Sequence, residues 1–174
     1  METAFLALGS NLGNRFRHLQ NALRALAEAG VDVRRASPVY QTAAHTLDPD
    51  ESQPDYFNAV VEVGVRRAPP QLLRLAKTLE QDAGRDLSAR AWAPRPLDID
   101  LLTVGNRTLR SSTLTVPHPR IADRRFVLRP WADLAPNLVV PSPFDASVSD
   151  LLHRCIDTES VEQIAHTLCV SPIQ

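Results

Sequence analysis

Hydrophobic and polar residues alternate along the chain with two different periods, and the changes of period predict the first elements. Residues 5–8 form a short apolar run, which predicts a strand that ends in the glycine-rich turn of residues 9–14. Apolar side chains then recur every three or four positions over residues 16–26, as on the buried face of a helix. Asn14 is suited to cap the start of this helix, and Gly30 to end it.

The following segments predict two more strands and a second helix. Residues 31–40 contain β-branched side chains and are typical of a strand, whereas residues 42–55 combine prolines and acidic groups without a period and predict a mobile loop. Residues 57–65 alternate strictly, with one apolar face, and predict a strand. Paired prolines then open a helix over residues 69–83, which Gly84 ends.

A second loop, residues 85–94, leads into a short strand at residues 95–102. The predicted order is therefore β-α-β-β-α-β, which is typical of an α+β, ferredoxin-like fold with helices on one side of a mostly antiparallel sheet. From Gly105 onward we expect a hairpin followed by short helices, and residues 147–150 resemble a capping box that opens one of them. We expect one domain over residues 1–174.

Composition narrows the class of protein. The chain has 174 residues, enough for one domain with a buried core, and its net charge of −1 argues against a general nucleic-acid or membrane-surface protein. Cys155 and Cys169 match no zinc-ligand spacing, and we expect both thiols to be reduced. The apolar run at residues 4–8 is too short for a signal peptide, and no later run is long enough to span a membrane. We expect a cytoplasmic protein.

Two aspartates, Asp98 and Asp100, interrupt the predicted strand RPLDIDLL. Side chains alternate along a strand, so the apolar residues between them face one way and both carboxylates face the other, with Cα atoms roughly 7 Å apart. At that spacing each carboxylate is expected to oppose ionisation of the other. The face that carries the aspartates is either exposed to solvent without a function or binds a cation. The cation is favoured because aspartate is a poor strand former and because Mg²⁺ binds one or two carboxylates when phosphates supply its other ligands.

Arginines are frequent in the loops on both sides of this strand. A solvated surface explains any one of them, but as a set around two carboxylates they favour a phosphate site, because guanidinium groups bind phosphate oxygens in pairs. A magnesium ion between phosphates and aspartates would reconcile both signs of charge, as phosphoryl transfer requires. The arginines concerned are Arg85, Arg90, Arg95, Arg120, Arg124 and Arg125.

The few aromatic residues lie near the same segments. Core packing explains each of them, but two together could also hold a flat heterocycle, with Asn58 offering a donor and an acceptor at the edge of the ring. His118 lies between prolines in the sequence TVPHP. It is either a residue of a rigid turn or a base or phosphate contact.

Taken together, these segments resemble the 6-hydroxymethyl-7,8-dihydropterin pyrophosphokinase family of folate biosynthesis. They occur in the family's order and span nearly the whole chain, and the last two are the most specific. The matching segments are ALGSNLGN (7–14), QPDYFNAVV (53–61), LEQDAGR (79–85), WAPRPLDIDLL (92–102) and LTVPHPRIADRRFVLRP (114–130).

The resemblance implies transfer of a diphosphoryl group from ATP to the hydroxymethyl group of the pterin, with release of AMP. It implies a monomer with small-molecule substrates and no nucleic-acid or membrane partner. Residues 43–54 and 85–93 would be mobile loops that close over the substrates. Asp98 and Asp100 would hold two Mg²⁺ ions, and Arg85 and Arg95 would act with them in catalysis. The pterin would be bound by Thr42, Tyr56, Asn58 and Phe126, and ATP by Arg85, Trp92, Arg95, Leu101, Thr115, His118 and Arg124.

The chain departs from the family pattern at two basic loop positions, which are Leu87 and Ala91 here. These changes concern loop closure and nucleotide binding, and they leave room for a relative that binds a pterin or nucleotide without catalysis. A ferredoxin-like RNA-binding module is a further alternative. It would need an exposed aromatic sheet face and a basic surface, and the composition supplies neither.

Overall fold

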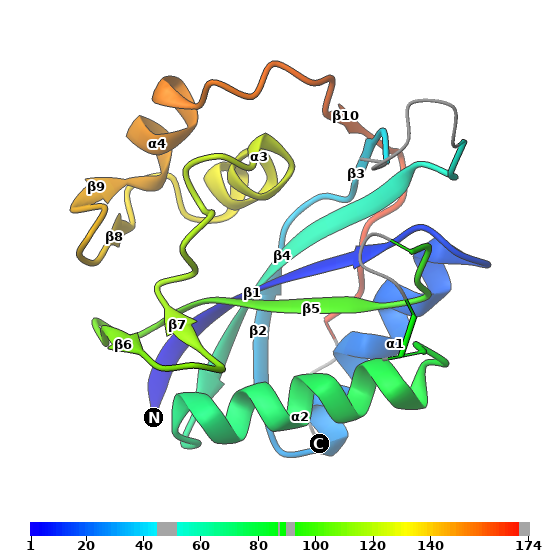
Figure 1. Ribbon diagram of the computed structural model, residues 1–174, viewed down its shortest axis with the longest axis horizontal. Helices are drawn as coiled ribbons and strands as arrows, with labels where there is room; N and C mark the ends of the chain where they lie inside the picture. The colour runs from blue at the N-terminus through cyan, green and yellow to red at the C-terminus, as the bar shows by residue number, and fades with distance from the viewer. Residues whose placement is uncertain (45–51, 87, 90–92, 171–174) are drawn as a thin grey trace.

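Strands and helices alternate along the computed structural model (Figure 1), which describes residues 1–44, 52–86, 88–89 and 93–170. The elements in chain order are β1 (Glu2–Ser10), α1 (Arg15–Glu28), β2 (Asp32–Ala36), β3 (Tyr40–Thr42), β4 (Tyr56–Val65), α2 (Pro69–Asp82), β5 (Asp98–Val104), β6 (Leu109–Arg110), β7 (Thr115–Val116), α3 (Arg125–Leu134), β8 (Val139–Val140), β9 (Ala146–Ser147), α4 (Val148–Arg154) and β10 (Glu162–Gln163).

The central sheet has the strand order β10-β3-β4-β1-β5, and β2 also pairs with β4. Every pair in it is antiparallel. The antiparallel sheet, with α1 and α2 in the predicted places, confirms the ferredoxin-like fold, although the observed order up to β5 is β-α-β-β-β-α-β. The prediction of one strand over residues 31–40 is wrong, because Ser37 and Pro38 separate β2 from β3 and proline cannot donate to a strand ladder.

Helices α1 and α2 cover one face of the sheet, as Figure 1 shows. The predicted apolar face of α1 is confirmed, because Leu19, Leu23 and Leu26 are buried in the core, and the Asn14 side chain accepts a hydrogen bond from the Arg17 amide at 3.0 Å. Two prolines open α2, as predicted. This face of the sheet is therefore covered mainly by apolar side chains.

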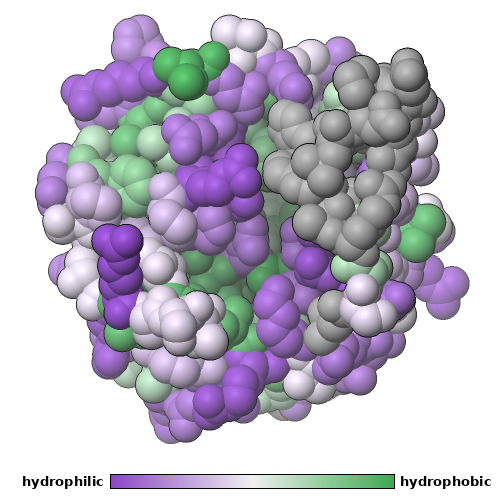
Figure 2. Space-filling model, viewed as in Figure 1, coloured by the Kyte–Doolittle hydropathy of each residue, from purple (hydrophilic) through white to green (hydrophobic). Residues whose placement is uncertain are grey.

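The other face of the sheet is only partly covered. Helix α3 packs against it with α4 and the small β8–β9 pair, around a second cluster that includes Phe5, Val60 and Trp131 (Figure 1). Ser147 caps α4, as predicted, by accepting a hydrogen bond from the Asp150 amide at 3.1 Å. Figure 2 shows that the centre of this face is hollowed, with apolar surface at its base and hydrophilic side chains around it.

The described part of the chain contains no helix that is both long enough and apolar enough to cross a membrane.

Candidate active site

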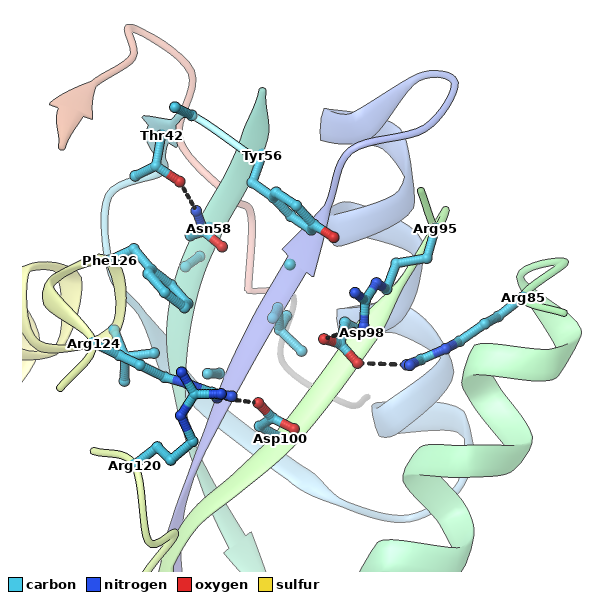
Figure 3. Close-up of a pocket in the computed structure, with 16 residues that line it drawn as sticks. Thr42, Tyr56, Asn58, Arg85, Arg95, Asp98, Asp100, Arg120, Arg124 and Phe126 are labelled. Carbon is cyan, nitrogen blue, oxygen red and sulfur yellow. Dashed lines mark hydrogen bonds and ion pairs between the residues drawn. The ribbon is translucent and has the colours of Figure 1, made fainter. Parts of the chain in front are cut away.

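A pocket of about 360 Å³ lies on the partly covered face of the sheet. Strands β1, β4 and β5 form its floor, and residues from β3, the end of α2 and the start of α3 form its walls (Figure 3). Its lining residues are Ala7, Leu8, Gly9, Thr42, Ala43, Tyr56, Asn58, Ala59, Arg85, Arg95, Asp98, Asp100, Arg120, Arg124, Phe126 and Val127.

The strand register explains why residues far apart in the sequence meet here. Gly9 pairs with Asn58 on one side and with Asp98 on the other, and Ala7 pairs with Asp100 in the next row. These side chains therefore share one face of the sheet. Asn58 and Asp98 are separated by one strand, or about 9–10 Å across the sheet.

Small residues of β1 keep the middle of the floor open, a feature that the sequence analysis missed. A Cβ atom on Gly9 would lie 3.3 Å from Asn58 Oδ1 and 3.6 Å from the Tyr56 ring. The signal was present in the sequence, because Phe5, Ala7 and Gly9 share one face of β1 and decrease in size toward the pocket.

Two arginines hold the Asp98 carboxylate. Arg85 Nη1 donates a hydrogen bond to Oδ1, and Arg95 Nη1 lies 3.3 Å from Oδ2 (Figure 3). The Arg95 Nε atom is buried and makes no hydrogen bond in the structure. A buried donor without a partner is costly unless a ligand completes it. Arg95 thus keeps one buried donor that no described residue uses, while its Nη1 atom pairs with Asp98.

Asp100 is held from the opposite wall. Arg124 Nη1 donates to its Oδ2 atom at 2.7 Å, and His118 Nε2 lies 3.9 Å from the same oxygen. Burial alone would raise the pKa of Asp100, but His118 and Arg124 outweigh it and hold that pKa below its usual value. The expected opposition between the two aspartates does not decide the ionisation of Asp100, because its neighbours His118 and Arg124 favour the charged form.

His118 is oriented by its own turn. Its Nδ1 atom accepts a hydrogen bond from the Arg120 amide at 3.1 Å, which leaves the proton on Nε2, facing Asp100. Burial lowers the pKa of His118, and Arg124 and Arg120 lower it further, against the opposing effect of Asp100. Arg124 is thus the constant positive partner of Asp100, and His118 is a neutral hydrogen-bond donor near pH 7.

A buried glutamate, Glu80 of α2, supports this end of the pocket, and the sequence analysis missed it. Its side chain is 0% exposed. Glu80 accepts a hydrogen bond from the Ile99 amide at 2.8 Å and forms ion pairs with Arg85 at 2.8 Å and Lys77 at 2.9 Å. It thus fixes both the strand between the two aspartates and the arginine that holds Asp98.

Asn11 fixes the other arginine, and sequence analysis did not single it out either. The Arg95 backbone N–H donates a hydrogen bond to the side-chain oxygen Oδ1 of Asn11 at 2.8 Å. The Asn11 backbone N–H donates in return to the Arg95 carbonyl oxygen at 3.1 Å. Asn11 is fully buried. The turn after β1 therefore sets the backbone from which the Arg95 guanidinium reaches Asp98.

The opposite end of the pocket is neutral. Asn58 is 6% exposed and donates a hydrogen bond to Thr42 Oγ1 at 2.8 Å. Tyr56 and Phe126 lie on either side of Asn58 in Figure 3. The Arg95 guanidinium lies 5.9 Å from the Tyr56 ring centre, and that of Arg124 lies 5.8 Å from the centre of Phe126. Two aromatic side walls and an amide edge leave a slot suited to a flat polar ring.

Four of the predicted ATP residues lie away from the pocket lining or outside the described residues. One of them is His118, which lies beside Asp100 but is not a lining residue. The Leu101 side chain is buried in the core with α1 and α2, on the opposite face from Asp100, so its placement does not support an ATP contact through the side chain. Thr115 lies on β7 and does not line the pocket. Trp92 lies outside the described residues, as do parts of both predicted closing loops (45–51, 87 and 90–92).

The donor set at the charged end fits Mg²⁺. Asp98 and Asp100 supply hard oxygen ligands on one face, and no group of three or more histidine, cysteine, aspartate or glutamate side chains in the described residues could hold a metal alone. Mg²⁺ commonly binds one or two carboxylates and takes its remaining ligands from water and phosphates. The arginines around the aspartates suit those phosphates.

Comparison with known proteins identifies the family. The sequence model of 7,8-dihydro-6-hydroxymethylpterin-pyrophosphokinase (HPPK) matches residues 5–136. The chain belongs to the HPPK family. It is 41% identical over 139 residues to 2-amino-4-hydroxy-6-hydroxymethyldihydropteridine pyrophosphokinase of Synechocystis sp., covering 79% of this chain and 69% of that protein.

Longer relatives contain the matching region as one part. The chain is 42% identical over 130 residues to the mitochondrial folate synthesis bifunctional protein of Arabidopsis thaliana, covering 74% of this chain and 23% of that protein. Among solved structures, Plasmodium falciparum HPPK-DHPS wild type with pteroate superposes with a TM-score of 0.70 at 13% identity, over 88% of this chain and 44% of that chain. This likeness shows that the two share the fold.

Proposed function

We propose that this protein transfers diphosphate from ATP to the hydroxymethyl group of 6-hydroxymethyl-7,8-dihydropterin and releases AMP, as a step of folate biosynthesis. One observation carries the proposal. Two carboxylates from alternate residues of β5 share a pocket with four arginines at one end and an aromatic slot with an amide edge at the other. One pocket thus suits a polyphosphate and a flat heterocycle side by side.

The charged end would bind the triphosphate. Asp98 and Asp100 would hold Mg²⁺, two ions in the arrangement we expect, and the metal would neutralise phosphate charge and align the β-phosphate. Arg85 and Arg95, already beside Asp98, would bind phosphate oxygens, and Arg124 would do so from the side of Asp100. His118 would donate a hydrogen bond from Nε2.

The neutral end would bind the pterin. Tyr56 and Phe126 would stack on the two faces of the ring, and Asn58 and Thr42 would bind its edge. The hydroxymethyl oxygen would then point along the floor, over Gly9, toward the phosphates. It would attack the β-phosphorus and lose its proton to solvent, the bond from that phosphorus to the oxygen bridging to the α-phosphorus would break, and AMP would leave with that oxygen. Holding both reactants on one rigid sheet supplies the proximity that such a transfer requires.

The experiment is direct. Purified protein is mixed with ATP, MgCl₂ and 6-hydroxymethyl-7,8-dihydropterin, and the nucleotide products are separated. We expect AMP in an amount equal to the pterin diphosphate formed, and no AMP when a chelator removes the magnesium. Formation of ADP would indicate single phosphoryl transfer and contradict the proposal.

The presence of Leu87 and Ala91 at basic positions of the family pattern favours one alternative, a protein that binds the pterin or the nucleotide without transfer. The same assay separates the two functions. Binding of the pterin with no AMP over a long incubation would establish the alternative.

A further inference from the structure

The C-terminal segment after α4 touches both walls of the neutral end of the pocket. It lies outside residues 5–136, which the family model matches. In Figure 1 the chain leaves α4, passes beside α3, adds β10 to the sheet next to β3, and then runs toward α1. An inference about this segment rests on the proposed function, because it concerns how the pterin is held.

The first contact is a cap on α3. This helix begins at Arg125, and its own N-cap residue, Arg124, makes no capping hydrogen bond through its side chain. Asp157 supplies the missing acceptor from 32 positions further along the chain, because its Oδ2 accepts a hydrogen bond from the Arg125 amide at 3.0 Å. The first residues of α3 include Phe126, which forms one aromatic wall of the pocket.

The second contact holds β3. Glu162 and Gln163 of β10 pair with Gln41 and Tyr40, and the Ile164 amide donates to the Val39 carbonyl oxygen at 2.9 Å. Without β10, this strand of three residues would have only β4 as a partner. β3 ends at Thr42, the partner of Asn58 in the pocket.

The segment is itself anchored beyond these contacts. Gln20 of α1 forms two hydrogen bonds with the Cys169 backbone, each of 2.8 Å. Leu168 is 5% exposed and belongs to the core between the sheet and the helices. Because both ends are fixed, by α4 and by the core, the chain between them can hold α3 and β3 at a set separation.

We propose that Asp157 and β10 position the neutral end of the pocket, Asp157 by capping the helix that carries Phe126 and β10 by holding the strand that ends at Thr42. Neither touches the proposed substrates. They are positioning elements, and their loss raises the KM for the pterin more than it changes the KM for ATP or kcat.

Two substitutions and a matched control test the cap. D157A removes the acceptor, whereas D157N retains a side-chain oxygen that can cap. D123A removes the same charge two residues before α3, at an exposed position. We expect D157A to raise the KM for the pterin about threefold to tenfold, the range that loss of one helix cap supports, and D157N and D123A to change it less than twofold.

Hydrogen exchange at α3 provides a readout that does not depend on turnover. In D157A the amides of Arg125 and Phe126 should exchange faster than in the wild type, and in D123A they should not. Unchanged exchange, or a pterin KM in D157A equal to that of the wild type, would overturn the role of Asp157. An equal rise of the pterin KM in D157A and D123A would show an effect of charge alone, and would also overturn the role of Asp157. A wild-type protein that forms no AMP would instead contradict the proposed function.

A second pair of variants tests β10. I164P removes the amide that donates to Val39, and I164A removes only part of the side chain. We expect I164P to raise the pterin KM at least threefold above that of I164A. Equal kinetics in the two variants would show that the strand pairing does not position the pocket.

Discussion

The two ends of the pocket are built in different ways. The charged end is a network of ion pairs in which each aspartate already has cationic partners, with Glu80 buried behind it. The neutral end is made of two aromatic rings and the Asn58 amide, which donates a hydrogen bond to Thr42. In the proposed function the charged end would exchange partners on binding a metal and phosphates, whereas the neutral end would keep the shape it has in the structure.

Because of this difference, we expect the two ends to contribute to different kinetic constants. Interactions that form fully only as charge moves in the transition state affect kcat, whereas a preformed slot affects binding. Substitutions at the charged end should therefore lower turnover or stability, and those at the neutral end should lower pterin affinity.

Glu80→Ala should have the largest effect on stability. It leaves the Ile99 amide without its acceptor and Arg85 with Asp98 alone of its two carboxylates, and breaking a buried ion pair typically costs about 3–5 kcal/mol. Urea denaturation measures the loss. Lys77→Ala is the control, because Lys77 is 41% exposed and its removal should cost less than about 1 kcal/mol. If Glu80→Ala lowered the free energy of unfolding by less than about 1 kcal/mol, Glu80 would not be a structural support of the charged end.

Asp98→Ala should lower kcat by on the order of 10²–10³, the usual cost of losing one charged group that stabilises the transition state. It also frees Arg85 and Arg95, so binding of ATP in the absence of magnesium should become tighter. Steady-state AMP release and calorimetry measure the two effects. Retained turnover with the wild-type dependence on magnesium would show that Asp98 is not a metal ligand.

Asn58→Ala should weaken pterin binding about tenfold to hundredfold, since loss of a buried hydrogen-bonding group costs about 1–3 kcal/mol. ATP binding should change less than twofold, because Asn58 lies one strand away from Asp98. Separate titrations with each ligand test this. Equal weakening of both would mean that Asn58 supports the whole pocket.

Tyr40→Phe should have a small effect at neutral pH and a distinct one in alkali. Burial, with the hydrogen bond to Asp133, raises the pKa of Tyr40 to about 12 from an ordinary 10. The folded state therefore keeps the proton that the unfolded chain loses above pH 10. The free energy of unfolding falls by about 2–3 kcal/mol as the pH rises from 10 to 12. Denaturation at pH 9 and 11.5 should show a smaller fall in the variant, and an equal fall would contradict the assignment.

Most of the fold could be predicted from local patterns. Helical spacing and the capping residue Asn14 gave α1, the paired prolines gave the start of α2, and alternation placed Asp98 and Asp100 on one face. Each of these signals lies within one element. The break between β2 and β3 was missed because β-branched residues on both sides of Pro38 outweighed the single proline.

The residues that hold the site residues in place were harder to predict, because they act through contacts between distant segments. Glu80 lies four residues after buried Ala76 on the inner face of α2, so a charge on that face was a usable signal. The hydrogen bonds that Asn11 accepts from Arg95 and Asp157 accepts from Arg125 join residues 84 and 32 positions apart, and no periodicity reveals them. Only the folded arrangement brings such groups together.

The central claim is that Asp98 and Asp100 together bind the metal that carries the triphosphate. The most direct test is a crystal structure of the protein with a non-hydrolysable ATP analogue, with Mn²⁺ in place of Mg²⁺ so that anomalous scattering locates the ions. The account predicts manganese coordinated by Oδ atoms of both aspartates, at about the 2 Å expected for such bonds, and by phosphate oxygens. Manganese bound elsewhere, with Asp98 and Asp100 still paired only to their arginines, would contradict it.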